Sequence, residues 1–118
     1  MRTAAELLAA RCRPLEGRPA MDDGQVAAQL AVLAHWQLTD GAISRTFRFA
    51  GYFETIAFVN ALAWMVHGED HHPDLRVGHD RCEVRFSTHS VGGISENDFI
   101  CAAKADAIFE RRCGSAAA

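Results

Sequence analysis

Histidines are the residues most capable of chemistry in this sequence, and five of the six lie between residues 67 and 89. Imidazole has an unperturbed pKa of about 6.5, so it accepts and donates protons near neutral pH. His71 and His72 are adjacent and precede Pro73, which favours a stiff extended segment. The other members of the cluster lie at predicted element ends, from which the rings can converge at one end of a sheet: His67, His79 and His89. The histidines by themselves leave two interpretations open: an acid–base site, or surface and internally bonded histidines, which are common outside sites.

Zinc binding is a further chemistry that histidine spacing can indicate. His67 and His71 are four residues apart, as in zinc-binding helices, but such helices carry a glutamate directly after the first histidine. Gly68 occupies that position here, and Gly68 and Pro73 both disfavour a continuous helix through the site. We therefore expect no metal site.

The cysteines give no sign of a metal knuckle or a redox motif. No two of them are separated by only two residues: Cys12, Cys82, Cys101 and Cys113. The first residues are a poor match to an export signal because Glu6 interrupts their apolar stretch. We expect reduced thiols in a cytoplasmic protein, with Cys82 and Cys101 packed as small hydrophobic side chains.

The overall composition limits the classes of partner. The chain has 118 residues, of which 49% are hydrophobic and 23% charged, and a formal net charge of −3. This length and composition predict a single folded domain. The net negative charge argues against nucleic acid or an anionic membrane as a partner. No apolar run approaches the roughly 18 residues that a membrane span requires.

The elements that position the histidines follow from hydrophobic periodicity and turn residues. A loosely held arm over residues 1–21, with helical turns at residues 4–10, precedes a helix that Asp22 and Gln25 cap and that ends at residues 35–36. Asp40-Gly41 predicts a hairpin between strands at residues 36–39 and 42–49. A long helix over residues 52–67 ends at Gly68.

The second half repeats this order of elements. Strands over residues 75–77 and 82–88 precede a helix with Ser95 as its cap and Asp98 at the capping-box position. We expect an α+β domain over residues 22–112, with three helices packed on one face of a four-stranded antiparallel sheet. Residues 113–118 are expected to form a disordered tail.

Several of these residues together resemble the signature of the pterin-4a-carbinolamine dehydratases. The matching positions are His67, His71-His72-Pro73, His89 within Ser87-Thr88-His89, Gly93 and Asp98. Aromatic residues also fall where that family places them: Trp36, Phe47, Phe49 and Phe58. The resemblance covers about residues 22–110, and the fold that it implies agrees with the α+β domain expected above.

The resemblance implies a reaction and a site. Members of the family expel the 4a-hydroxyl group of a hydroxytetrahydropterin and form the quinonoid dihydropterin, which requires an acid for the leaving hydroxyl and a base for the N5 proton. Carried over residue by residue, the catalytic set is His71, His72 and His89, with Asp98 orienting or charging a histidine. The implied substrate pocket adds His67, Pro73, Leu75, His79 and Thr88. The pterin is the substrate or ligand, and no separate cofactor is implied.

The sequence departs from the family pattern at three of these positions. His79 replaces an aromatic residue, Leu75 a frequent tryptophan and His67 a frequent glutamate. A planar pterin packs on apolar and aromatic walls. Losing an aromatic wall at His79 would weaken pterin binding by about 1–2 kcal/mol.

The chain is also similar to a carboxysome-associated subgroup of dehydratase-like proteins. The similarity lies in residues 12–17 and in residues 87–99. It implies a RuBisCO assembly factor with little or no pterin turnover, which is the function we expect first, with RuBisCO as partner and a cytoplasmic, carboxysome-associated location. The alternative is an active dehydratase in tetrahydropterin recycling. The resemblance also implies at least a homodimer, and residues 82–88 offer a strand edge for pairing.

Overall fold

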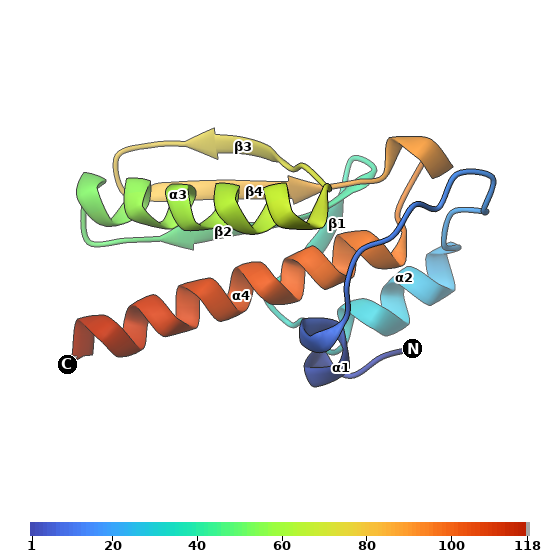
Figure 1. Cartoon of the computed structure of the whole chain (residues 1–118), viewed down its shortest axis with the longest axis horizontal. Helices are drawn as coiled ribbons and strands as arrows, with labels where there is room; N and C mark the ends of the chain where they lie inside the picture. Colours follow the sequence, from blue (N-terminus) through green and yellow to red (C-terminus); the bar gives the residue numbers. More distant parts are fainter. Residues whose placement is uncertain (118) are drawn as a thin grey trace.

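The computed structural model describes the backbone of residues 1–117 and the side chains of residues 1–111. Its elements, in chain order, are α1 (Ala4–Ala9), α2 (Asp23–Leu30), β1 (Gln37–Thr39), β2 (Ala42–Arg48), α3 (Tyr52–Glu69), β3 (Asp74–Val77), β4 (Arg81–Phe86), the 3-10 helix η1 (His89–Val91) and α4 (Glu96–Ala117). The strands form one antiparallel sheet, and α3 and α4 pack against each other and against β4 (Figure 1). The expected α+β fold is confirmed.

The strands lie in the order β1-β2-β4-β3. β4 is therefore an interior strand, and its Cys82, Val84 and Phe86 side chains are completely buried. The prediction that residues 82–88 expose an edge is wrong, because alternation along a strand identifies its buried face but not its neighbours. The edges of the sheet are β1 and β3.

The first hairpin has the turn that its sequence predicts. Asp40 and Gly41 have φ values of 50° and 79°, as a type I′ turn requires of both central residues. Thr39 and Ala42 are the last paired residues on either side. This turn fixes the register that places Ile43 and Phe47 in the core.

The end of α3 differs from the prediction and positions the histidines. The helix continues through Gly68, and Asp70 takes the left-handed conformation with φ 52°. The backbone N–H of Asp70 donates to His67 O, and that of His71 donates to Val66 O, both at 3.2 Å. This is the Schellman arrangement, in which the left-handed residue follows the last helical turn. The chain therefore turns sharply at Asp70, directly before His71.

A cluster of aromatic rings fills the space between the sheet and the helices. Phe47 is its centre: its ring lies 4.6 Å from that of Phe58, 5.2 Å from Phe109 and 6.0 Å from Trp36, measured between centroids. Phe86 joins through Trp36, at 5.9 Å. The cluster links β2, β4, α3 and α4 and so fixes the sheet against the helices that carry the site.

The N-terminal arm is packed against the domain. Leu7 is completely buried, and Met21 N–H donates to Ile94 O at 2.9 Å. Cys12 Sγ lies 3.5 Å from Cys101 Sγ on α4, and both thiols are free. Contact with Cys12 and burial raise the pKa of Cys101. The expectation of a loose arm is wrong, because its apolar side chains find partners in parts of the chain far away in sequence.

The remaining differences concern helix ends. α2 ends at Leu30, and turns rather than helix lead into β1. The predicted tail falls at the end of the described backbone, where α4 continues to Ala117, and residue 118 lies outside the described residues. No helix in the described chain is both long and apolar enough to span a membrane.

Candidate active site

Asp98, in the first turn of α4, is the centre of a buried polar network. One carboxylate oxygen, Oδ1, lies 2.6 Å from His71 Nε2. The other, Oδ2, accepts hydrogen bonds from the Thr88 hydroxyl at 2.8 Å and from the Ser95 backbone N–H at 2.9 Å. Asp98 is completely buried, and a buried carboxylate is stable only when it is paired and hydrogen-bonded in this way.

Local sequence explains why Asp98 occupies this position. Ser95 Oγ accepts a hydrogen bond from Asn97 N–H at 3.2 Å, and Asp98 Oδ2 accepts one from Ser95 N–H at 2.9 Å. The Asp98 contact is the one that the spacing of Ser95 and Asp98 predicts, whereas the Ser95 hydroxyl bonds to the N–H of Asn97 instead of that of Asp98. The positive end of the α4 dipole also favours a carboxylate in its first turn. Asp98 therefore caps the start of α4 and also holds His71 in place.

The second wall of the network is the loop after β4. Thr88 and Gly93 form an isolated antiparallel bridge, with Thr88 N–H donating to Gly93 O at 2.8 Å. η1 lies inside this loop, and Gly92 closes it with φ 70°, a conformation that glycine adopts without strain. His89 is exposed at the start of η1. The loop thus holds the Thr88 hydroxyl inward and presents His89 to solvent.

The contacts of His71 define its hydrogen-bonding roles. An ionised Asp98 only accepts hydrogen bonds, so Nε2 of His71 carries the hydrogen and Nδ1 of the neutral ring keeps its lone pair. The ring stacks on Phe86 at 6.0 Å with an interplanar angle of 12°. Its side chain is 11% exposed. The carboxylate therefore orients the His71 ring.

The structure brings together part of the predicted site. Asp98 is in direct contact with both His71 and Thr88. His72 and His89 are exposed, and they follow His71 and Thr88, respectively, in the sequence. The end of α3 and the end of β4 lie on the same side of the molecule (Figure 1). The other predicted pocket residues that lie near the end of α3 or on the edge strand β3 are His67, Pro73 and Leu75.

β3 and β4 form a second hairpin, and His79 lies in its turn. This turn is at the end of the hairpin opposite to His71 and Thr88. β4, which lies between His79 and Thr88, is six residues long and therefore spans about 20 Å at roughly 3.3 Å per residue. Its ring stacks on Tyr52 at 6.2 Å, and its carbonyl accepts from the Thr55 hydroxyl at 3.0 Å. Within one chain His79 does not join His71, because the extended strand separates them.

His79→Tyr is therefore expected to leave pterin binding unchanged. A tyrosine in this exposed turn would stack on Tyr52, as the imidazole does, about a strand's length from the Asp98 network. The dissociation constant for 7,8-dihydropterin, measured by fluorescence titration, checks this, with Leu75→Trp as the companion variant on β3. Tighter binding by the His79 variant alone would show that the turn contributes to the pocket, for instance from a second copy of the chain.

A cavity of about 180 Å³ adjoins the network. His71, Thr88 and Asn97 line it on one side, and arm residues 12–16 on the other. Asn97 and Glu69 do not belong to the histidine pattern, so no role for them was predictable from the sequence. No local pattern in the sequence predicts that the arm packs against the cavity beside His71 and Thr88.

Glu69 is the charged residue that connects the arm to the site. Its carboxylate accepts from Cys12 N–H at 2.8 Å and pairs with Lys104 Nζ and Arg11 Nε, both at 3.0 Å. Burial opposes its ionisation, but the Cys12 N–H, Lys104 and Arg11 outweigh this effect, so the pKa of Glu69 lies below its usual value. Glu69 therefore stays charged at neutral pH and keeps these contacts.

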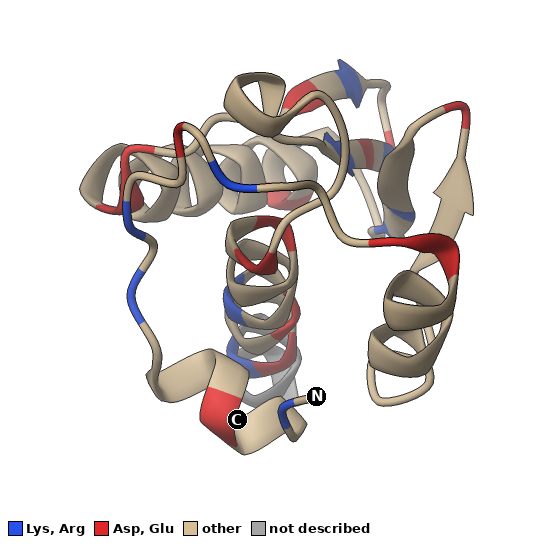
Figure 2. Cartoon of the chain, turned by 90° about the vertical axis from the view of Figure 1, so that its right-hand side faces the viewer, with Lys and Arg blue, Asp and Glu red and all other residues tan. Residues whose placement is uncertain are grey.

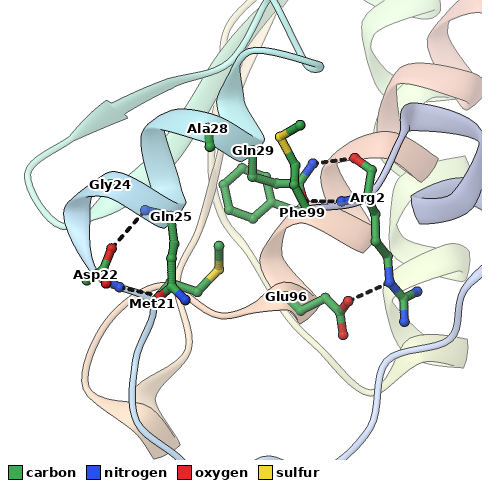
Figure 3. A pocket seen from close by; sticks show the side chains of 10 residues that line it. Arg2, Met21, Asp22, Gly24, Gln25, Ala28, Gln29, Glu96 and Phe99 are labelled. Carbon is green, nitrogen blue, oxygen red and sulfur yellow. Dashed lines mark hydrogen bonds and ion pairs between the residues drawn. The ribbon is translucent and has the colours of Figure 1, made fainter.

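A larger cavity, of about 540 Å³, lies between the N-terminus, α2 and the start of α4. Figure 3 shows that its polar side chains are bonded within the protein. Arg2 pairs with Glu96 at 2.7 Å, Gln29 bonds to the Arg2 backbone, and Gln25 caps α2. With its polar groups so engaged, this cavity is a weaker candidate than the histidine site. Within the described residues, no three His, Cys, Asp or Glu side chains are grouped to hold a metal ion.

Comparison with known proteins identifies the family. The family model described as pterin 4 alpha carbinolamine dehydratase matches residues 19–108. The chain belongs to this family. A Nitrosomonas europaea dehydratase-family protein is 50% identical over 112 residues, covering 93% of this chain and 99% of its own length. One from Stenotrophomonas maltophilia strain K279a is 56% identical over 108 residues, covering 89% and 93%. Both are provisionally named pterin-4-alpha-carbinolamine dehydratase.

Solved structures of the dehydratase family agree with the fold. A transcriptional coactivator/pterin dehydratase from Brucella melitensis has a TM-score of 0.72 and 31% identity, covering 75% of this chain and 97% of its own. A pterin dehydratase-like protein identified as a RuBisCO assembly factor in the alpha-carboxysome is more distant. Its TM-score is 0.53 and its identity 25%, covering 63% of this chain and 86% of its own.

Proposed function

We propose that this protein is an active pterin-4a-carbinolamine dehydratase. The observation that carries the proposal is the His71–Asp98 pair, which Thr88 and Ser95 anchor. The exposed His72 and His89 follow His71 and Thr88 directly in the sequence. The relatives that are 50–56% identical and provisionally named as dehydratases support it. This reverses the order expected from the sequence, where RuBisCO assembly came first.

The proposed reaction removes water from a 4a-hydroxytetrahydropterin. A protonated histidine gives its proton to the leaving 4a-hydroxyl group, and a neutral histidine takes the proton from N5, so that water and the quinonoid dihydropterin form. His72 and His89 are exposed and therefore accessible to a substrate. Asp98 holds the third ring, His71, in a fixed orientation and places a carboxylate beside it. The site needs no metal or separate cofactor for this step.

His72→Ala and His89→Ala are each expected to lower kcat by about a hundredfold, the usual contribution of a proton-transfer group. Both side chains are exposed, so the free energy of unfolding should change by less than about 0.5 kcal/mol. The assay follows dehydration of freshly generated 4a-hydroxytetrahydropterin, beside thermal unfolding. His35→Ala is the matched control, because His35 is also exposed but lies outside the family pattern.

The same assay decides between the two functions expected from the sequence. Turnover by the wild-type protein that both site variants lose supports the dehydratase. Absence of turnover from folded wild-type protein would contradict it, and co-expression with RuBisCO subunits would then test assembly activity. The structural match to the RuBisCO assembly factor is more distant than that to the Brucella protein, so carboxysome association has the weaker support. A cytoplasmic location stays a prediction.

We also propose that the protein self-associates through β3. This edge strand is exposed along its whole length, including the apolar Leu75 at 38% and Val77 at 44%. Such an edge is normally paired or protected. Size-exclusion chromatography with light scattering is expected to show at least a dimer, and Val77→Lys to shift it toward monomer. A wild-type species of 12.9 kDa alone would contradict the proposal.

A further inference from the structure

The arm wall, which we define as residues 12–16, forms one side of the cavity beside His71 and Thr88. It lies outside the stretch that the family model matches, which begins at residue 19. Figure 2 shows the arm rising beside α4 and then crossing above its near end toward α2. The site thus has a wall that is built by a segment beyond the matched part of the family fold.

Two buried side chains hold the arm wall in place. Asn97 Nδ2 donates to Arg13 O at 2.7 Å, and Asn97 Oδ1 accepts from Arg13 N–H at 3.2 Å. Glu69 accepts from Cys12 N–H at 2.8 Å. Asn97 immediately precedes Asp98, and Glu69 is two residues before His71. The hydrogen bonds of Asn97 and Glu69 therefore connect the arm wall to the residues of the active site.

Glu16 and Asp70 are the carboxylates of this cavity that remain available to a ligand. The Asn97, Glu69, Thr88 and His71 side chains are already bonded within the protein. Among the described residues, neither Glu16 nor Asp70 has a side-chain hydrogen bond or ion pair. The cavity therefore offers negatively charged hydrogen-bond acceptors on the arm wall and on the end of α3.

The chemistry of a pterin matches these acceptors. Its pyrimidine edge presents two neighbouring donors, the 2-amino group and N3–H, which a carboxylate binds as it binds a guanidinium group. The cavity, at about 180 Å³, is smaller than the roughly 300 Å³ typical of a site that encloses a whole ligand. It is therefore suited to one end of the pterin, next to His71 and Thr88.

We propose that the arm wall is part of the substrate site, that Asn97 and Glu69 position it, and that the Glu16 carboxylate accepts hydrogen bonds from the amino-pyrimidine edge of the pterin. This inference rests on the proposed dehydratase function. It assigns substrate recognition to Glu16, outside the histidine motif, and makes Asn97 a positioning residue.

The contact is tested with Glu16→Gln and two ligands, 7,8-dihydropterin and 7,8-dihydrolumazine, which carries a carbonyl oxygen in place of the 2-amino group. Loss of a charged hydrogen-bond acceptor is expected to raise the dissociation constant for dihydropterin about tenfold. The constant for dihydrolumazine should change much less. Glu16 is exposed, so the variant should fold normally, and Asp23→Asn is the control for loss of one exposed negative charge. Asp70→Asn repeats the test across the cavity, because asparagine also tolerates the left-handed conformation.

The positioning role of Asn97 is tested with Asn97→Ala, which removes the hydrogen bonds to Arg13. Glu96→Ala is the control, because it removes a contact between α4 and Arg2 but none to the arm wall. We expect Asn97→Ala to raise KM for the dehydration about tenfold, with a smaller effect on kcat, because a loosened wall weakens binding. A fall in kcat alone would mean that Asn97 acts through Asp98 and would overturn its positioning role.

The outcomes separate this inference from the proposed function. Wild-type protein that binds dihydropterin and turns over substrate, with Glu16→Gln unchanged, would overturn the inference and leave the dehydratase intact. Equal losses for dihydropterin and dihydrolumazine would also overturn the assigned contact. Wild-type protein with neither binding nor turnover would overturn the proposed function and the inference with it.

Discussion

Asp98→Asn is expected to lower kcat for pterin dehydration by a factor of about a hundred to ten thousand. The asparagine is close in size, and its single oxygen will face the donors that Asp98 Oδ2 now serves, Ser95 N–H and the Thr88 hydroxyl. Its NH2 group then faces His71 Nε2, which must become an acceptor. His71 therefore loses both the partner that orients its ring and the negative charge beside it. Steady-state kinetics with freshly generated 4a-hydroxytetrahydropterin checks this.

Asp106→Asn is the control for the loss of a carboxylate on α4, since the Asp106 side chain is also mostly buried, at 14% exposed. Asp106 accepts from Trp36 Nε1–H at 2.9 Å and from Arg45 Nη1 at 2.5 Å, on the aromatic side of the helix. Its replacement should lower the free energy of unfolding, while kcat of the folded protein stays within about twofold. Equal kcat losses in the two variants would mean that Asp98 acts through general stability, and full activity of Asp98→Asn would contradict the proposed site.

Phe47→Ala is expected to lower the free energy of unfolding by about 3–5 kcal/mol. Phe47 is 1% exposed and contacts the rings of Trp36, Phe58 and Phe109. The Arg45 guanidinium also lies 4.3 Å from its ring centroid. Truncation leaves a cavity at the point where β2 meets α3 and α4, and the neighbouring rings cannot all move to fill it. Chemical denaturation followed by circular dichroism measures the effect.

Phe53→Ala provides the comparison for Phe47→Ala. Phe53 is 82% exposed on α3, so its truncation should change the stability of the monomer by less than about 0.5 kcal/mol. A Phe47 variant with near wild-type stability would show that the aromatic cluster is not the centre of the core. A large loss in the Phe53 variant would show instead that this face of α3 is covered, as by a second copy of the chain.

The sequence by itself determined the local elements that lie around the site. Asp40-Gly41 is a turn whose two central residues need positive φ, so the hairpin and its register were predictable. Ser95 and Asp98 have the spacing of a reciprocal helix cap, so the start of α4 was predictable too. The family could also be recognised from sequence, because the pattern around His71 and His89 depends on residue type and spacing alone.

Features that depend on distant contacts were decided only by the tertiary structure. The interior position of β4 depends on hydrogen bonds with β2 and β3, and strand alternation does not specify neighbours. The separation of His79 from His71 follows from the length of β4, although both residues belong to one sequence pattern. The arm wall is held by Asn97, which is 84 residues away from Arg13. Local pattern specifies elements and capping contacts, whereas the pairing of strands and the return of the arm depend on burial across the whole chain.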